Sequence, residues 1–208
     1  MSGPELNLTI IVYGSSETDP SGNERFCGER QRRAEIELRP RVPNRDMLRN
    51  QTQMNAWAQG VLNSVGVDVK HTQKWHCEFC TKPARETVHM VMSWMHLNPP
   101  KLNVYVHNIC DAGVGRCSET LRSIQAEAAL FATGGPGLPP RLPPAADGQY
   151  PLAASCARCK REETAEQDLQ RCSRCKLIRY CCVNCQREDW VRHKVVCRMV
   201  KNVAWVWD

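Results

Sequence analysis

The first 131 residues carry hydrophobic patterns of two different periods. Residues 6–13 are rich in β-branched and apolar side chains, and residues 34–38, 87–96 and 102–106 alternate between apolar and polar positions. Alternation with a period of two is typical of strands that bury one face. The sequence therefore predicts four strands here, the first two forming a hairpin or sheet pair across the turn signal Asp19-Pro20-Ser21-Gly22.

Two other segments repeat apolar residues at the spacing of an amphipathic helix. The first helix is predicted to begin near Pro43-Asn44, to end at Gly66 and to pack on the sheet; its apolar positions are Met47, Met54, Ala58, Val61 and Val65. The second is predicted to be capped by Ser118 and ended by Gly134 and Gly135; its apolar positions are Leu121, Ile124, Ala128 and Phe131.

A proline-rich stretch divides the chain. Five prolines fall between Pro136 and Pro144, and such a composition favours an extended, semi-rigid linker. We therefore expect an α+β region at residues 1–131, a Pro/Gly-rich linker at 132–151, and a cysteine-rich unit with an apolar tail at 152–208. The tail, residues 203–208, either continues the last helix and packs on the cysteine-rich unit or leads into a longer chain.

The 208 residues include thirteen cysteines. The sequence shows no secretory signal, and its longest nearly apolar run, residues 8–13, is far shorter than the roughly 20 residues of a membrane span. An intracellular protein of the nucleus or cytoplasm is expected. In a reducing compartment, clustered cysteines indicate metal binding or catalysis more often than disulfides.

The strongest motif is Cys156-x2-Cys159-x12-Cys172-x2-Cys175-x5-Cys181-x3-Cys185-x7-His193-x3-Cys197. Structural zinc takes four tetrahedral nitrogen or sulfur ligands, so eight ligands divide into two closed sites. His193 and Cys197 are four residues apart and lie on one face of a helix. Spacing favours Cys181 over its neighbour Cys182 as the ligand, which leaves Cys182 as a spare thiol.

This array, together with Arg179-Tyr180-Cys181, Cys185-Gln186, Trp190 and His193-Lys194, resembles the MYND-type zinc finger over residues 156–197. The resemblance implies two interleaved zinc sites. Their ligands would be Cys156, Cys159, Cys181 and Cys185 in one site, and Cys172, Cys175, His193 and Cys197 in the other. A segment this short builds little hydrophobic core, so crossed metal sites would hold it together.

The resemblance also implies a function, because similar fingers bind short proline-containing segments of the PxLxP type. The groove would be lined by Gln186 and Trp190, beside a strand at residues 177–180 that includes Tyr180. Gln186 and Trp190 share a helical face, where the indole can support a proline and the amide can hold a peptide carbonyl. The competing interpretation assigns Trp190 to the small core and Gln186 to a helix cap.

A second cluster lies upstream. Cys77 and Cys80 form a CxxC knuckle, and Cys110 and Cys117 follow the predicted strands beside the second helix. This order predicts a treble-clef-like, all-cysteine site for a third zinc ion, with His107 as the rival ligand. Residues 75–121 also resemble a region that precedes the finger in many fungal MYND proteins. Cys27 is interpreted as a free thiol, and His71, His89 and His96 as non-ligands.

Charge weakens the case for nucleic-acid binding. The net charge is +6, but eleven zinc-bound thiolates contribute −11 and three zinc ions +6, which leaves about +1. The basic residues are dispersed and show no interleaved aromatic ladder. No catalytic constellation is visible, so the chain is not expected to be an enzyme. The favoured hypothesis is a zinc-stabilised adaptor or transcriptional co-regulator for proline-rich partners; a nucleic-acid-binding regulator is the alternative.

The linker itself matches PxLxP twice, at residues 136–140 and 140–144, which share Pro140. Only eleven residues separate these segments from Cys156. Tethering would give such a ligand an effective concentration near the millimolar range. The chain's own linker is therefore a candidate occupant of the groove, either within one chain or between two; the plainer interpretation is a simple spacer.

Overall fold

A computed structural model of the protein describes residues 3–15, 33–80, 82–94, 97, 100–133 and 150–206. Four features discussed above lie outside the described residues. They are the turn at residues 19–22, Cys27, His96 and the central linker with its two PxLxP matches.

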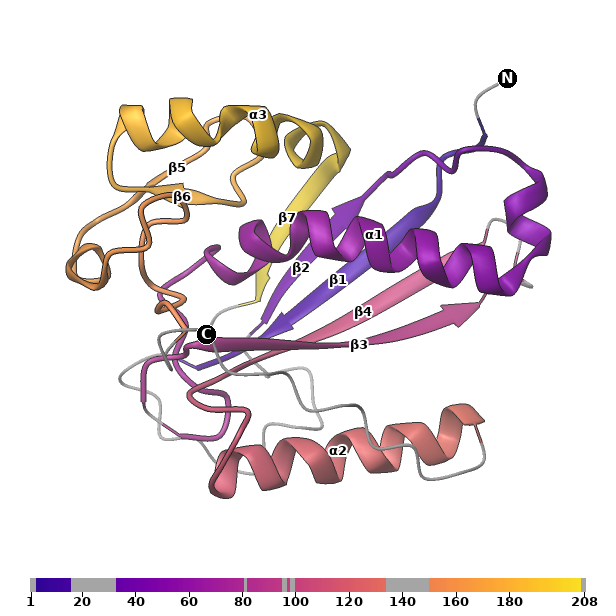
Figure 1. Ribbon diagram of the computed structural model, residues 1–208, viewed down its shortest axis with the longest axis horizontal. Helices are drawn as coiled ribbons and strands as arrows, with labels where there is room; N and C mark the ends of the chain where they lie inside the picture. The colour runs from indigo at the N-terminus through magenta and orange to yellow at the C-terminus, as the bar shows by residue number, and fades with distance from the viewer. Residues whose placement is uncertain are drawn as a thin grey trace.

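The described residues contain a five-stranded sheet with the order β3-β4-β1-β2-β7 (Figure 1). Its strands are β1 (Asn7–Tyr13), β2 (Arg33–Leu38), β3 (Glu86–Trp94), β4 (Lys101–Ile109) and β7 (Val200–Val206). β1 and β4 are parallel, and the other neighbouring pairs are antiparallel. All four strands predicted from residues 1–131 are confirmed, including the β1–β2 pair.

Helix α1 (Gln51–Lys70) covers one face of the sheet (Figure 1). The alternating strands send their fully buried residues to this face, so a single hydrophobic core forms beneath the helix. The strand residues of this core include Leu8, Ile10, Val12, Ala34, Ile36, Leu38, Leu102, Val104 and Val106.

Both predicted ends of α1 need correction. A 3-10 helix, η2 (Asp46–Arg49), precedes α1, and the Asn50 side chain caps α1 by accepting a hydrogen bond from the Gln53 amide. The helix then runs through Gly66 and ends at Lys70. Glycine costs a helix interior only about 1 kcal/mol relative to alanine. The burial of Val69 and Asp68 beyond it outweighs this local preference.

Helix α2 (Arg116–Thr133) lies on the opposite side of the sheet from α1 (Figure 1). Its first half packs through Leu121 against Ile109, with Val88 beside them. α2 begins two residues before the predicted cap, Ser118. The Ser118 hydroxyl donates instead to the carbonyl of Ala112, 2.7 Å away, and so ties the helix to the preceding loop.

The cysteine-rich unit contains η3 (Glu162–Thr164), a small two-stranded sheet of β5 (Gln170–Arg171) and β6 (Arg179–Tyr180), and helix α3 (Val183–Met199). The tail does not continue α3 as a helix. It turns into β7, which pairs with β2 at the edge of the large sheet, so that Val203 faces Ile36 and Trp205 faces Ala34. The valine-rich alternation of this segment suits a strand, and β2 offers an unpaired edge to it.

No helix among the described residues has both the length and the apolar character needed to cross a membrane.

Candidate metal centres

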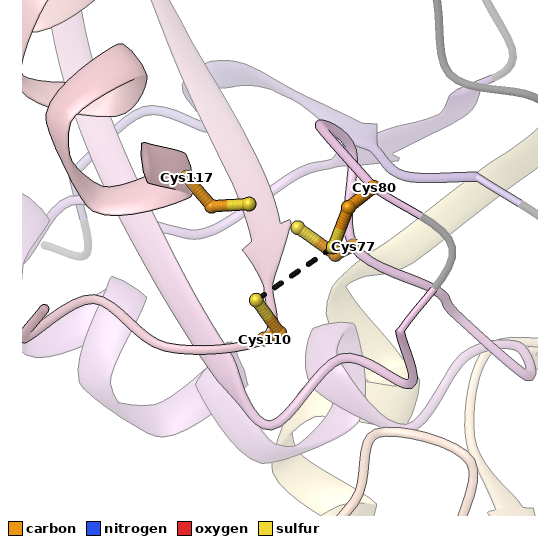
Figure 2. Close-up of side chains that lie close together, drawn as sticks. All are labelled: Cys77, Cys80, Cys110 and Cys117. Atoms are coloured by element: carbon orange, nitrogen blue, oxygen red, sulfur yellow. Dashed lines mark hydrogen bonds between the residues drawn. The ribbon is translucent and has the colours of Figure 1, made fainter. Parts of the chain in front are cut away.

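The upstream cluster brings together all four cysteines predicted for it. Cys77 and Cys80 lie on the knuckle, Cys110 follows β4, and Cys117 lies in the first turn of α2. Figure 2 shows their sulfur atoms pointing toward one another, and all four lie within 4.8 Å of one another. The sulfurs of Cys80 and Cys110 are 3.8 Å apart. Four thiolates about 2.3 Å from a tetrahedral zinc ion lie about 3.8 Å apart, so this cluster fits the ion.

The thiols of this cluster cannot all ionise without a cation. The dashed line in Figure 2 marks the contact between the Cys80 and Cys110 sulfurs. The nearby Cys110 thiol, followed by burial, strongly raises the pKa of the Cys77 thiol, and the nearby Cys77 thiol lowers the pKa of Cys110 to about 5. Burial, followed by the neighbouring thiols, raises the pKa of Cys117 to about 12. A divalent cation at the centre removes this competition, because it stabilises all four thiolates together.

His107, the rival ligand, lies outside the four-residue cluster. Its Nδ1 is 2.8 Å from Oε2 of Glu78, and both side chains are buried. The imidazole also stacks on the ring of Tyr13, with 5.5 Å between the ring centroids. The structure therefore favours the all-cysteine set as metal ligands. His107 contacts Glu78, the residue next to Cys77 in the knuckle, instead of the metal site.

The first cluster of the cysteine-rich unit contains Cys156, Cys159, Cys181 and Cys185. The Sγ of Cys181 lies 3.8 Å from that of Cys159 and 3.5 Å from that of Cys185. Cys182 is exposed and is not a member of the cluster. The structure thus selects Cys181 over its neighbour, as the spacing predicted.

The second cluster contains Cys172, Cys175, His193 and Cys197, all of which are buried. The Sγ atoms of Cys172 and Cys197 are 4.0 Å apart, and the Sγ of Cys175 lies 3.5 Å from Nε2 of His193. A tetrahedral zinc ion would hold such a nitrogen–sulfur pair about 3.6 Å apart. The ligands of the two clusters alternate along the chain in pairs, which is the interleaving that the resemblance implies.

His193 is oriented by a residue that the sequence analysis did not identify. Asp68, fully buried on α1, accepts hydrogen bonds from Nδ1 of His193 and from Arg192. Burial lowers the pKa of His193, but the hydrogen bonds to Asp68 and Cys175 outweigh it and raise that pKa to about 10. A carboxylate on Nδ1 fixes the tautomer that presents Nε2 to the metal. An acidic residue between two valines was the only signal of this role in the sequence.

Two arginines fasten the cysteine-rich unit to the segment after α1. Arg179 is buried and donates to the backbone carbonyls of His71, Ala153 and Ala154. Arg171 donates to the carbonyl of Thr72. His71 itself is not in a metal cluster; its Nδ1 lies 2.9 Å from the carbonyl of Ser155, and burial lowers its pKa to about 3. It is therefore neutral at pH 7.

The predicted peptide-binding residues have different surroundings. Trp190 keeps 42% of its surface exposed, and Gln186 is half-buried one helical turn before it. Tyr180 is 2% exposed, and its hydroxyl donates to Oδ2 of Asp189, 2.8 Å away. The Tyr180 ring is therefore too buried to form a wall of a peptide-binding groove. Its hydrogen bond to Asp189 instead connects β6 to α3.

Comparison with known proteins identifies this unit. The sequence model of the MYND finger matches residues 156–197. Similar proteins include human Egl nine homolog 1, 44% identical over 66 residues, which cover 32% of this chain and 13% of that protein. Mouse N-lysine methyltransferase SMYD2 is 30% identical over 103 residues, covering 50% of this chain and 22% of that protein.

SET domain-containing protein 14 of Caenorhabditis elegans is 38% identical over 67 residues, covering 29% of this chain and 16% of that protein. The chain thus spans less than a quarter of the length of each of these relatives. No solved structure matches the chain. The alternating ligand pairs and the matched residues agree: the chain contains a MYND-type zinc finger at residues 156–197, whose two clusters fit zinc.

Proposed function

We propose that the protein is a non-catalytic adaptor or transcriptional co-regulator whose finger recognises proline-containing, PxLxP-like segments of other proteins. The observation that carries this proposal is the exposed indole of Trp190 on a helix that two metal sites hold in place. Exposed aromatic side chains on a rigid support are the usual anchors of protein–protein recognition, since little conformational entropy is lost when they bind.

The surroundings of Trp190 support this assignment. Val183, Gln186 and Trp190 are spaced i, i+3 and i+7 along α3, so they share one face of the helix. The Trp190 ring also meets the ring of His193 edge-on, with 6.0 Å between their centroids. Because His193 belongs to the second metal cluster, a bound zinc ion would steady the ring that the Trp190 indole contacts. The Gln186 amide would then donate to a peptide carbonyl.

The segment at residues 177–180, beside this helix face, is expected to position the face rather than to contact the peptide through its side chains. Leu177 and Ile178 are fully buried, and the carbonyl of Arg179 already accepts a hydrogen bond from Ala157, at 3.2 Å. A bound segment would therefore gain its specificity from the helix face, with the buried Tyr180 ring holding that face in position.

The test is a calorimetric titration of the zinc-loaded full chain with a synthetic PxLxP peptide. Trp190→Ala and Gln186→Ala should each weaken binding by about tenfold or more. Val191→Ala and Val195→Ala are matched controls, because these residues are 75% and 53% exposed on the same helix but lie outside the proposed face. Equal losses in all four variants, or no binding to the wild type, would contradict the proposal.

The chain's own linker is the competing occupant that this experiment must address. A Leu138→Ala/Leu142→Ala double variant removes the central residue of both PxLxP matches. If the linker occupies the face, the double variant should bind the external peptide more tightly than the wild type at low protein concentration. Equal affinities and an unchanged oligomeric state would leave the linker as a spacer.

A further inference from the structure

An apolar cavity of about 310 Å³ lies between α1 and the sheet, and none of its lining residues belongs to α3. Its walls come from α1, β1, β3 and β4, and Tyr150 and Pro151 line it as well. The apolar side chains that line it include Ile10, Leu62, Val65, Val69, Val104 and Val106. A volume of this size is at the lower end of the range for small-molecule sites.

Gly66 is the one glycine among the described residues that line the cavity. It lines the cavity, and a Cβ added at this position would meet no atom within 4 Å. Glycine destabilises a helix interior relative to alanine, and neither a turn nor a close approach of the backbone requires it here. Gly66 is exposed, so it lies where the cavity opens to solvent, and a long side chain there would have room to cover the opening.

The polar groups of the cavity give it a cationic end. Nζ of Lys70 donates to the carbonyl of Arg85, 2.6 Å away, and lies 5.8 Å from the centre of the Tyr150 ring. Lys160, which is exposed, also lines the cavity and lies close enough to influence Lys70 electrostatically. An ammonium group has three donors, so Lys70 retains capacity for an anionic partner.

Four further titratable side chains line the cavity: Glu86, His71, His89 and Tyr150. His71 is neutral at pH 7, and Glu86 is the one carboxyl group against two lysines, so this end of the cavity keeps a net positive charge. Oε1 of Glu86 accepts a hydrogen bond from the amide of Ala112, at 2.7 Å, and burial raises the pKa of this carboxyl. Burial lowers the pKa of His89, which is therefore neutral at pH 7. A ligand with an apolar body and one negative group matches this distribution better than a cation or a polyanion does.

We propose that this cavity binds a small aliphatic carboxylate, with its chain among the valines and its carboxylate at Lys70 and Lys160. Size limits the ligand: a cavity of about 150 Å³ holds benzene, so twice that volume holds roughly ten to twelve non-hydrogen atoms. Octanoate and decanoate fall in this range. The site is separate from the peptide-binding face, so its test does not depend on the finger's partner.

The experiment is a calorimetric titration of the zinc-loaded full chain with octanoate, with 1-octanol and acetate as comparison ligands. Octanoate should bind more tightly than either, because only octanoate uses both the apolar walls and the lysines. Lys70→Met should weaken octanoate binding by about tenfold or more, since a charge-assisted hydrogen bond is lost. Gly66→Leu should weaken octanoate binding by about tenfold or more while raising the melting temperature, because a leucine at the opening obstructs the cavity and favours the helix.

Gly60→Leu is the matched control. Gly60 also lies within α1, and a Cβ added there would likewise meet no atom within 4 Å, but Gly60 does not line the cavity. The variant should therefore gain helix stability and keep octanoate binding. The proposal is overturned if octanoate does not bind, if 1-octanol binds as tightly, if Gly66→Leu binds normally, or if Gly60→Leu loses binding to the same extent.

Discussion

Asp68 accepts a hydrogen bond from Nδ1 of His193, a zinc ligand 125 residues further along the chain. The carboxylate is fully buried and also pairs with Arg192, which in turn contacts Asp189. Through this contact the end of α1 becomes part of the second zinc site. The finger is therefore not structurally independent of the sheet region. The orientation of His193 in the second cluster depends on Asp68 of α1, the helix that covers the large sheet.

Replacing Asp68 should consequently weaken one zinc site and spare the others. Asp68→Asn should reduce the zinc affinity of the second finger cluster by about tenfold to a hundredfold, as is typical when the partner of a ligating histidine is removed. Competition with a chromophoric chelator would measure this change. Asp168→Asn is the control, because Asp168 is exposed and lies in no metal cluster of the described residues; its ion pair with Lys74 is long, at 4.0 Å. Equal affinities in the two variants would contradict the assigned role.

Removal of zinc should unfold the finger and release β7, but leave the rest of the sheet. Each finger site contributes on the order of 10 kcal/mol to folding. The hydrophobic core is continuous with the finger, but β1, β2, β4 and α1 supply most of its buried residues. Amide exchange after chelation should therefore show lost protection at residues 156–206 and retained protection in β1. Protection that persists across residues 156–197 without metal would refute this prediction.

The neighbouring cysteines Cys181 and Cys182 provide a matched pair of variants. Cys181→Ser should release one zinc ion per chain, because Cys181 belongs to the first finger cluster. Cys182→Ser should retain the full zinc content, because its side chain is exposed and outside the cluster. Native mass spectrometry reports the stoichiometry directly, and the reverse result would show that the ligand had been assigned to the wrong neighbour.

Octanoate binding should weaken as the pH rises through about 8. Burial and then Lys160 lower the pKa of Lys70 to about 8, and Glu86 and Arg85 shift it further in opposite directions. A bound carboxylate would favour the protonated lysine, so binding takes up a proton above pH 8 and becomes weaker there. Below pH 8 the affinity should be flat while the ligand stays ionised. Titrations at pH 6.5, 8 and 9.5 would measure this, and Lys70→Met should show no such dependence.

Much of this structure follows from short-range sequence patterns. Alternation identified β1 to β4, because a half-buried strand constrains every second residue regardless of its partner. The ligand spacing identified the three clusters, because CxxC knuckles and an i, i+4 pair on a helix fix their own local geometry. Cys181 could be distinguished from Cys182 for the same reason.

The features that were missed depend on residues distant in sequence. Glycine is common just after helix ends, so Gly66 predicted the end of α1. The helix continues to Lys70 because Val69 and Asp68 are buried in the last turn. The tail became β7 because β2 offered it an edge, and Tyr180 became buried because Asp189 holds its hydroxyl. The sequence by itself determined which residues gather into the three candidate metal clusters. Only the tertiary structure decided what supports those residues, since the partner of a buried polar group is set by packing between elements and not by spacing along the chain.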